Sequence, residues 1–335
     1  MKSAKDLRWD LKSLGLSEAA IDAAWPEWWS EAAEPSVSAQ SELRFSLSRK
    51  LGLDPKSLLE DEPQFVWNDQ AKFKRLTTES ALERSALASF GASVGRALIS
   101  ATAENYFKLS PSAGSYRDLI LRREPFVSLQ SLLSLCWGLG IPVVSLRVFP
   151  LNSKRMSAMV VRVNGRFAVL LARESNFPAQ ISFYLAHELG HAALGHVDNE
   201  LAVVEFGDTI TDQSSDKEEI EADAYALELL TGFKDPAFLA EGSGFNAPAL
   251  ADVSLRSAVD LKIDPGVIAL CFGHSTRAWQ RVFSAMRMIY GGSRPVWRDV
   301  NRIAINQMDW TAVSDDTASF LQSVLGAGLD HASRH

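Results

Sequence analysis

Apolar residues recur at helical spacing through the first part of the chain, interrupted at intervals by Gly, Pro and Ser. The pattern predicts short helices near the N-terminus and then a long helix from about Ala71 to Asn105, whose many small residues would allow close packing against a neighbour. A further helix is expected over 128–139, because Gly140 and Pro142 follow it and are typical of a helix end.

Beyond Gly140 the pattern becomes typical of β-structure. The segments 141–149, 158–163 and 166–171 are rich in Val, Leu, Ile and Phe. Asn164-Gly165 separates the last two segments, and Asn-Gly is favoured in two-residue hairpin turns because both turn positions need a positive φ. We therefore expect three strands, at least two of them paired antiparallel.

Two further helices follow the predicted strands. One should begin at Asn176-Phe177-Pro178, because proline is tolerated in the first turn of a helix. The other should run over 216–230, where an acidic first turn suits the positive end of the helix dipole. After Gly232 the chain is predicted to be helical again, with helix starts near Asp264 and Thr276.

These elements predict an α+β fold that is mainly helical, with a small mixed or antiparallel sheet packed on the helix that begins at Pro178. We expect a small helical N-terminal domain over 1–64, a central domain over 65–235 and a helical regulatory or docking region over 236–335. The segment from Leu47 to Leu59 resembles the last two helices of the helix-turn-helix domains of phage-type repressors, although a helical protein-binding domain would explain the same pattern.

The composition is that of a globular chain. Of 335 residues, 47% are hydrophobic and 22% charged, which argues against disorder, collagen and coiled coil. The sequence lacks the run of roughly 18 to 20 apolar residues that a spanning helix needs, and its first residues lack the apolar segment of a secretion signal. Cys136 and Cys271 lie far apart in apolar segments, as expected for buried thiols in a reducing compartment. We therefore expect a cytoplasmic protein.

The formal net charge of −7 argues against a general nucleic-acid coat, but the charge is unevenly distributed. Residues 71–123 carry nine Lys or Arg against four Asp or Glu, whereas 198–223 carry ten acidic residues and one Lys. The basic block keeps nucleic-acid binding through 71–123 open as an alternative function.

Three of the six histidines fall within ten residues, in His187-Glu188-Leu189-Gly190-His191 and His196 just beyond it. His187 and His191 are four apart, so on a helix both rings leave the same face and can share one Zn²⁺. Glu188 would then be placed to polarise a water molecule as a general base. With two distant cysteines, a metal here must be bound by histidines and carboxylates.

A third ligand is expected from the helix over 216–230. Glu219 and Asp223 are four apart and share a face, which is similar to zinc peptidases in which an Asp four residues after the ligand Glu accepts a hydrogen bond from a ligand histidine. Glu219 would then be the ligand and Asp223 would orient His187. Glu221 is the competing ligand, although it points about 200° away from Glu219 around the helix.

His196 has two interpretations. It is a helix C-terminal residue beside Gly195, where a protonated imidazole suits the helix dipole. It is also a candidate ligand, because in one metal-binding pattern a third histidine stands ten residues after the first. The Gly expected in that pattern is displaced to position 195, and position 197 is Val.

The blocks 187–196 and 219–230 together resemble the ImmA/IrrE metallopeptidases, and the likeness covers about 85–231. The resemblance implies a zincin-like core of the gluzincin type and a zinc-dependent endopeptidase that cleaves helix-turn-helix repressors in stress, mobile-element or phage-defence switches. It also implies His187, His191 and Glu219 as ligands of one Zn²⁺ and Glu188 as the general base. Thr231-Gly232-Phe233 departs from the Met-Pro that often closes the second helix, which bears on the substrate.

Other functions and residues stay open. Tyr184, Tyr290 and His274 are candidate oxyanion stabilisers, and the sequence does not rank them. An antitoxin-like or transcription-associated regulator with a structural zinc is one alternative to the peptidase. A regulator that senses nucleic acid is the other.

Overall fold

The structure is a computed structural model that describes residues 1–67, 71–74, 80–103, 106–152, 156–197, 202–206, 216–238 and 245–327. Its α-helices are α1 Ala4–Ser13, α2 Glu18–Ala24, α3 Val37–Leu51, α4 Pro55–Leu59, α5 Ala81–Ser100, α6 Ala113–Leu121, α7 Leu129–Gly138, α8 Pro178–Ala193, α9 Lys217–Thr231, α10 Ala247–Leu261, α11 Pro265–Thr276, α12 Trp279–Ile289, α13 Trp297–Gln307 and α14 Asp315–Leu325. In the described part of the chain, none of these helices has the length and apolarity needed to cross a bilayer.

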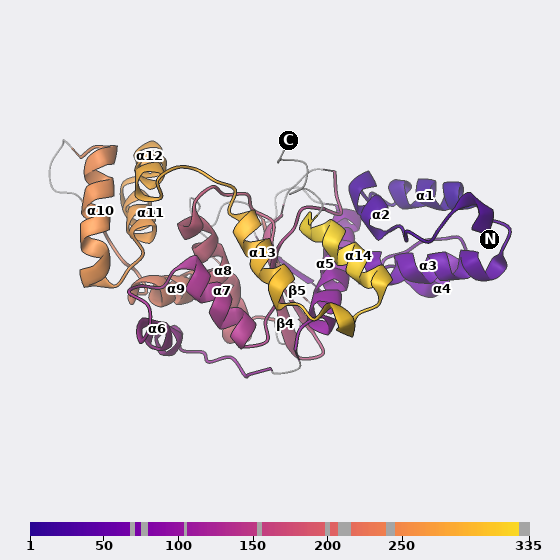
Figure 1. Cartoon of the computed structure of the whole chain (residues 1–335), viewed down its shortest axis with the longest axis horizontal. Coiled ribbons are helices and arrows are strands. Elements are labelled where there is room, and N and C mark those ends of the chain that lie inside the picture. The colour runs from indigo at the N-terminus through magenta and orange to yellow at the C-terminus, as the bar shows by residue number, and fades with distance from the viewer. Residues whose placement is uncertain are drawn as a thin grey trace.

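A mixed sheet of five strands lies in the middle of the molecule, in the order β1-β5-β3-β4-β2 (Figure 1). Its strands are β1 Ala71–Lys74, β2 Val143–Ser145, β3 Met156–Val163, β4 Arg166–Leu171 and β5 Ala202–Phe206. β3 pairs antiparallel with β4 and β5, whereas β1 and β2 run parallel to their neighbours. The mainly helical α+β fold with a small mixed sheet is therefore confirmed.

The predicted hairpin is also confirmed. Asn164 and Gly165 join β3 to β4 with φ values of 51° and 78°, as a two-residue turn with two left-handed positions requires. The turn fixes the register so that Val160 lies opposite Val169. This register decides which side chains of β3 face each side of the sheet.

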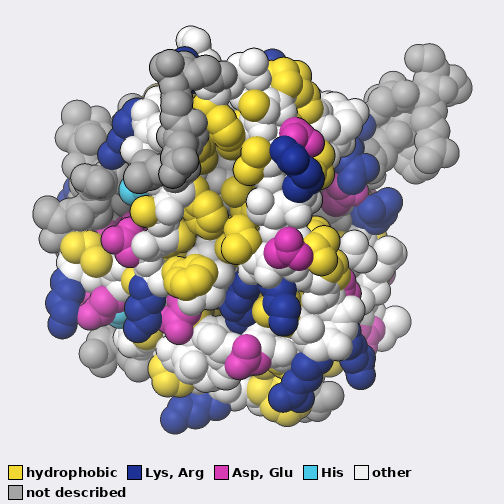
Figure 2. Space-filling view, turned by 90° about the vertical axis from the view of Figure 1, so that its left-hand side faces the viewer, with side chains coloured by type: hydrophobic (Ala, Val, Ile, Leu, Met, Phe, Trp, Pro, Cys, Tyr) yellow, Lys and Arg dark blue, Asp and Glu magenta, His cyan; other side chains and the backbone are white. Residues whose placement is uncertain are grey.

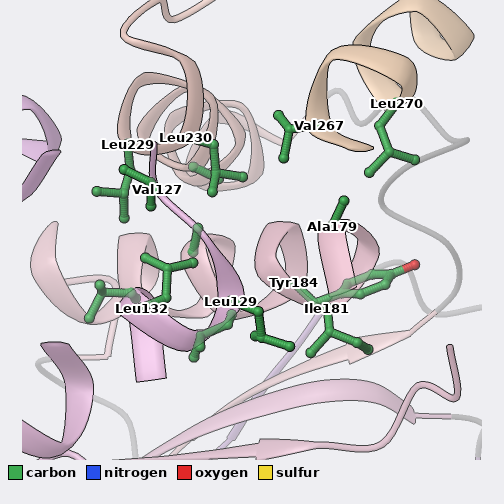
Figure 3. Packing of buried hydrophobic residues seen from close by; sticks show 14 of the residues in the cluster. Val127, Leu129, Leu132, Ala179, Ile181, Tyr184, Leu229, Leu230, Val267 and Leu270 are labelled. Carbon is green, nitrogen blue, oxygen red and sulfur yellow. The ribbon is translucent and has the colours of Figure 1, made fainter. Parts of the chain in front are cut away.

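Two hydrophobic cores lie on opposite faces of the sheet. Ala158 and Val160 of β3 belong to the first core, which they share with α7, α8, α9 and α11, as Figure 3 shows for the helices. Met159 and Val161 belong to the second core, which contains side chains of α5. The alternation follows from the two-residue period of a strand, and it makes β3 and β4 the layer between α8 and α5.

The second core joins the two ends of the chain. It contains Leu43 of α3 together with Phe320 of α14, whose ring meets that of Phe90 edge-on at 6.3 Å. Lys50 Nζ also donates to Asp316 Oδ1 at 2.7 Å, with the lysine side chain buried. Residues 1–64 and the last helix thus pack together beside α5, while the predicted domain boundaries stay predictions. The segment that resembles helix-turn-helix repressors forms the end of α3 and the five-residue α4.

The predicted helix over Ala71–Asn105 is wrong at its start. Residues 71–74 form β1, and the helix begins only at Ala81. Ser80 and Glu83 form a capping box, in which each side chain accepts a hydrogen bond from the backbone of the other, and this local signal marks the true start. The strand depends on pairing with β5, which follows far along the chain, so local spacing could not reveal it. The predicted end at Asn105 lies outside the described residues.

Helix α5 approaches the sheet closely at Gly95, where a Cβ atom would lie 2.3 Å from Val161 Cγ2. Val161 is a stiff β-branched residue in the second core and cannot move aside easily. We expect Gly95→Ala to lower the free energy of unfolding by about 1 to 2 kcal/mol, since overpacking outweighs the gain in helix propensity. Urea unfolding measures the change. Gly138→Ala is the matched control in α7, because nothing lies within 4 Å there, and an equal response of both variants would contradict the close approach.

One end of the molecule is formed by α10, α11 and α12, and the other by the N-terminal helices (Figure 1). Figure 2 looks onto the α10 end and shows apolar side chains gathered on it. The exposed large apolar residues of these helices are Val253, Leu255, Val259, Leu261 and Met288. The helical C-terminal region that the sequence predicts is present in the described residues, while its regulatory or docking role stays a prediction.

Candidate metal centre

Helices α8 and α9 bring the predicted chemistry together. α8 begins with Pro178 in its first turn and ends where Gly195 takes a φ of 79°. α9 begins after Asp216, whose side chain accepts a hydrogen bond from Glu218 N, and ends at Gly232 with a φ of 87°. Both helices therefore begin and end on the local signals that the sequence carries. Their contact places the histidines of α8 opposite the acidic residues of α9.

His187, His191 and Glu219 converge on one point, with one potential ligand atom of each lying within 4.8 Å of the others. His187 Nε2 lies 3.0 Å from His191 Nε2 and 3.6 Å from Glu219 Oε2, and His191 Nε2 lies 3.2 Å from Glu219 Oε1. All three residues are fully buried. Two imidazoles and a carboxylate are a donor set that suits a divalent transition metal, so the residues present fit a metal ion.

Asp223 lies where the sequence places it. Its Oδ1 is 2.9 Å from His187 Nδ1, on the side of the ring away from His191 and Glu219. The carboxylate therefore accepts a hydrogen bond from Nδ1–H and leaves the lone pair of Nε2 directed at the other two donors. This fixes both the tautomer and the orientation of the ring.

His191 is neutral at ordinary pH. Burial lowers its pKa to about 4, an effect that the neighbouring Glu219 only partly offsets. A neutral imidazole is the form that binds a metal, because its ring nitrogen must offer a lone pair.

Glu188 occupies a position that does not favour the stability of the fold. Its side chain is fully buried, and neither carboxylate oxygen has a hydrogen-bond partner among the described residues. Burial raises its pKa well above the usual range, and the charge of Glu219 raises it further. The backbone N–H of Val160 acts in the opposite direction and partly offsets the rise in the pKa. An unpartnered buried carboxylate is costly, so its presence beside three potential ligands indicates a functional role.

His196 and Glu221 have partners that the sequence did not suggest. His196 Nδ1 lies 2.9 Å from His191 Nδ1, and His196 Nε2 lies 3.2 Å from Glu221 Oε2. Glu219, and not Glu221, therefore joins the group of potential ligands. Gly195, which the sequence places at the helix end, explains this contact, since a glycine just past a helix end turns the next residue back onto the last turn.

The three candidate oxyanion stabilisers lie in different surroundings. Tyr184 is packed in the first core (Figure 3). Tyr290 donates a hydrogen bond to Asp264 Oδ1 at 2.7 Å and stacks on Phe177, next to the start of α8. The start of α8 at Pro178 lies roughly 14 Å along the helix from His187, at 1.5 Å per residue. His274 is exposed near the end of α11. The structure does not gather them around the ligands, and the oxyanion role stays a prediction.

Gly190 controls how closely the two helices approach. A Cβ atom at this position would lie 3.2 Å from both Cα and O of Ala222 in α9. We expect Gly190→Val to push α9 away and to weaken the binding of any metal ion at the candidate site by about tenfold or more, since ligands need sub-ångström placement. Competition with a chromogenic chelator measures the affinity. Gly138→Val is the matched control at an open helical position, and unchanged affinity in Gly190→Val would show that α9 is not held by this contact.

Comparison with known proteins found no matching protein family, no similar curated protein and no similar solved structure. The side chains of α8 and α9 themselves are therefore the evidence that bears on function. What they establish is a buried group of two histidines and a glutamate that can hold a metal ion.

Proposed function

We propose that this chain is a zinc-dependent endopeptidase with a zincin-like core, which cleaves a helix-turn-helix repressor or a similar regulatory protein. The observation that carries the proposal is the unpartnered, buried carboxylate of Glu188 beside His187, His191 and Glu219. Three protein ligands together with a neighbouring general base are the arrangement found in catalytic rather than structural zinc sites. The resemblance to the ImmA/IrrE metallopeptidases is part of this proposal.

Zinc fits the site better than the harder metals. Mg²⁺ and Ca²⁺ prefer sites made entirely of oxygen ligands, whereas this site offers two imidazole nitrogens and one carboxylate. When bound, zinc supplies Lewis-acid polarisation of a carbonyl group and makes water more acidic. Asp223 would hold His187 in the binding tautomer throughout.

Glu188 is proposed to move the proton in the reaction. Its carboxylate would accept a proton from the attacking water and deliver it to the nitrogen of the leaving amine. The raised pKa makes Glu188 a stronger base, so its carboxylate accepts the proton of the attacking water more readily. The dry surroundings strengthen each charge interaction in the site.

A purely structural zinc is the less favoured alternative. A structural zinc site normally has four protein ligands that fill its coordination sphere. It does not need a further buried carboxylate without a partner. Replacing Glu188 by an apolar residue would stabilise such a protein, because an unpaired buried charge is costly. Glu188 therefore favours a catalytic role.

One of the basic residues in 71–123 is not available to bind nucleic acid. Arg117 is buried and donates hydrogen bonds to the carbonyl oxygens of Leu230 and Lys262, at 2.8 Å and 2.7 Å. It therefore fixes the end of α9 and is not available to a phosphate. Nucleic-acid binding through the other basic residues of this block stays a prediction. The salt dependence of oligonucleotide binding would test it.

The proposal is tested by incubating the zinc-loaded protein with any purified helix-turn-helix repressor that proves to be encoded beside it. Mass spectrometry should find one specific cleavage, absent with a chelator. All four side chains of the site are fully buried in this structure. Zinc binding should therefore be measured first and cleavage second, with mild denaturant added to open the site. Both cysteines are buried and free, in line with the cytoplasmic location that we propose.

A further inference from the structure

His196 packs against a metal ligand from a direction that the proposed mechanism does not use. Its ring lies 5.0 Å from the ring of His191, centre to centre, and the two Nδ1 atoms are 2.9 Å apart. His196 is 8% exposed, so this contact is shielded from water. On its far side, Nε2 lies 3.2 Å from Glu221 Oε2. His196 and Glu221 thus form a series of polar contacts that leads from His191 to the surface of α9.

The backbone explains why His196 occupies this position. Gly195 adopts the left-handed conformation with a φ of 79°, and His196 N then donates to His191 O at 3.0 Å. This hydrogen bond spans six residues and is the signature of a Schellman motif, which ends helices by turning the chain back. The same motif places the side chain of the second residue past the helix end beside the last turn. The helix ending itself thus brings His196 to His191.

The direction of each hydrogen bond follows from the chemistry of the ligand. Nε2 of His191 faces His187 and Glu219, and a ring nitrogen that binds a metal carries no proton. The single proton of neutral His191 must then lie on Nδ1, which donates to Nδ1 of His196. His196 in turn carries its proton on Nε2, which donates to Glu221. Every nitrogen in this series of contacts has one defined role.

We propose that His196, backed by Glu221, is a positioning residue for the metal ligand His191, as Asp223 is for His187. The two ligand rings are then held by different acceptors, one by a carboxylate directly and the other by an imidazole with a carboxylate behind it. The inference rests on metal binding in the proposed function and does not depend on peptidase activity.

Zinc affinity tests the inference. His196→Phe keeps the size of the ring but removes the acceptor, and it should weaken zinc binding about 10-fold to 100-fold, as for other partners that orient metal-binding histidines. His196→Asn keeps an acceptor close to the position of Nδ1 and should retain most of the affinity. Asp223→Asn, which alters the partner of His187, provides the reference loss. Glu221→Leu should weaken binding less than His196→Phe, and Glu228→Leu on the same helix should not weaken it.

Protonation of the rings gives a second readout. In the zinc-loaded wild type, ¹H–¹⁵N spectra should show His196 protonated at Nε2 and bare at Nδ1, and His191 protonated at Nδ1. Circular dichroism shows which variants fold. If His196→Phe does not fold, the ¹H–¹⁵N spectra of the wild type decide whether His196 accepts a hydrogen bond from His191. A wild type that binds no zinc would overturn both this inference and the proposed function. If the wild type binds zinc and His196→Phe binds it equally tightly, this inference alone is overturned. The same holds if the zinc-loaded wild type shows His196 protonated at Nδ1.

Discussion

Glu188→Gln is expected to bind zinc as tightly as the wild type and to lose cleavage by about a thousandfold, within the usual contribution of a general base. Glutamine has the same shape as glutamate but cannot accept the proton of the attacking water. Glu188 is not one of the three converging ligand residues, so its replacement leaves the donor set intact. Metal content by mass spectrometry and the rate of repressor cleavage measure the two effects separately.

The same variant also tests the electrostatics of the site. Glu188→Gln removes a carboxylate that is buried without a partner next to Glu219, so the zinc-free variant should unfold at a temperature no lower than the wild type. This distinguishes loss of a catalytic group from loss of structure. Full cleavage by Glu188→Gln would rule out the general-base role.

Glu219→Ala is expected to abolish stoichiometric zinc binding. It removes one of the three proposed ligands and the only carboxylate among them, whose oxygens lie 3.2 Å and 3.6 Å from Nε2 of His191 and of His187. A free zinc concentration of about a thousand times the dissociation constant stabilises the folded protein by about 4 kcal/mol. A chelator should therefore lower the melting temperature of the wild type and leave that of Glu219→Ala unchanged.

Glu221→Ala is the matched control for this experiment, since it alters an acidic residue on the same helix that contacts His196 instead of the ligand group. It should still take up one zinc at saturating metal, with a weaker affinity. Loss of zinc in Glu221→Ala with full binding in Glu219→Ala would show that the ligand assignment is wrong.

The sequence by itself determined the features that depend on neighbours within a few residues. Pro178 and Asp216 mark the starts of α8 and α9, and Asn164-Gly165 makes the hairpin, because caps and turns are set by local backbone geometry. The spacing of His187 and His191 places both rings on one face of α8, because a helix repeats every 3.6 residues. These local signals were sufficient to predict a metal-binding helix behind a hairpin.

The tertiary structure alone decided what depends on contacts between distant segments. β1 exists through its pairing with β5, and the sharing of the second core by α3 and α14 joins residues from opposite ends of the chain. The choice of Glu219 over Glu221 depends on the rotation of α9 about its axis. That rotation is fixed where Gly190 meets Ala222, since packing between two helices is set by the shapes of both surfaces and by neither sequence alone.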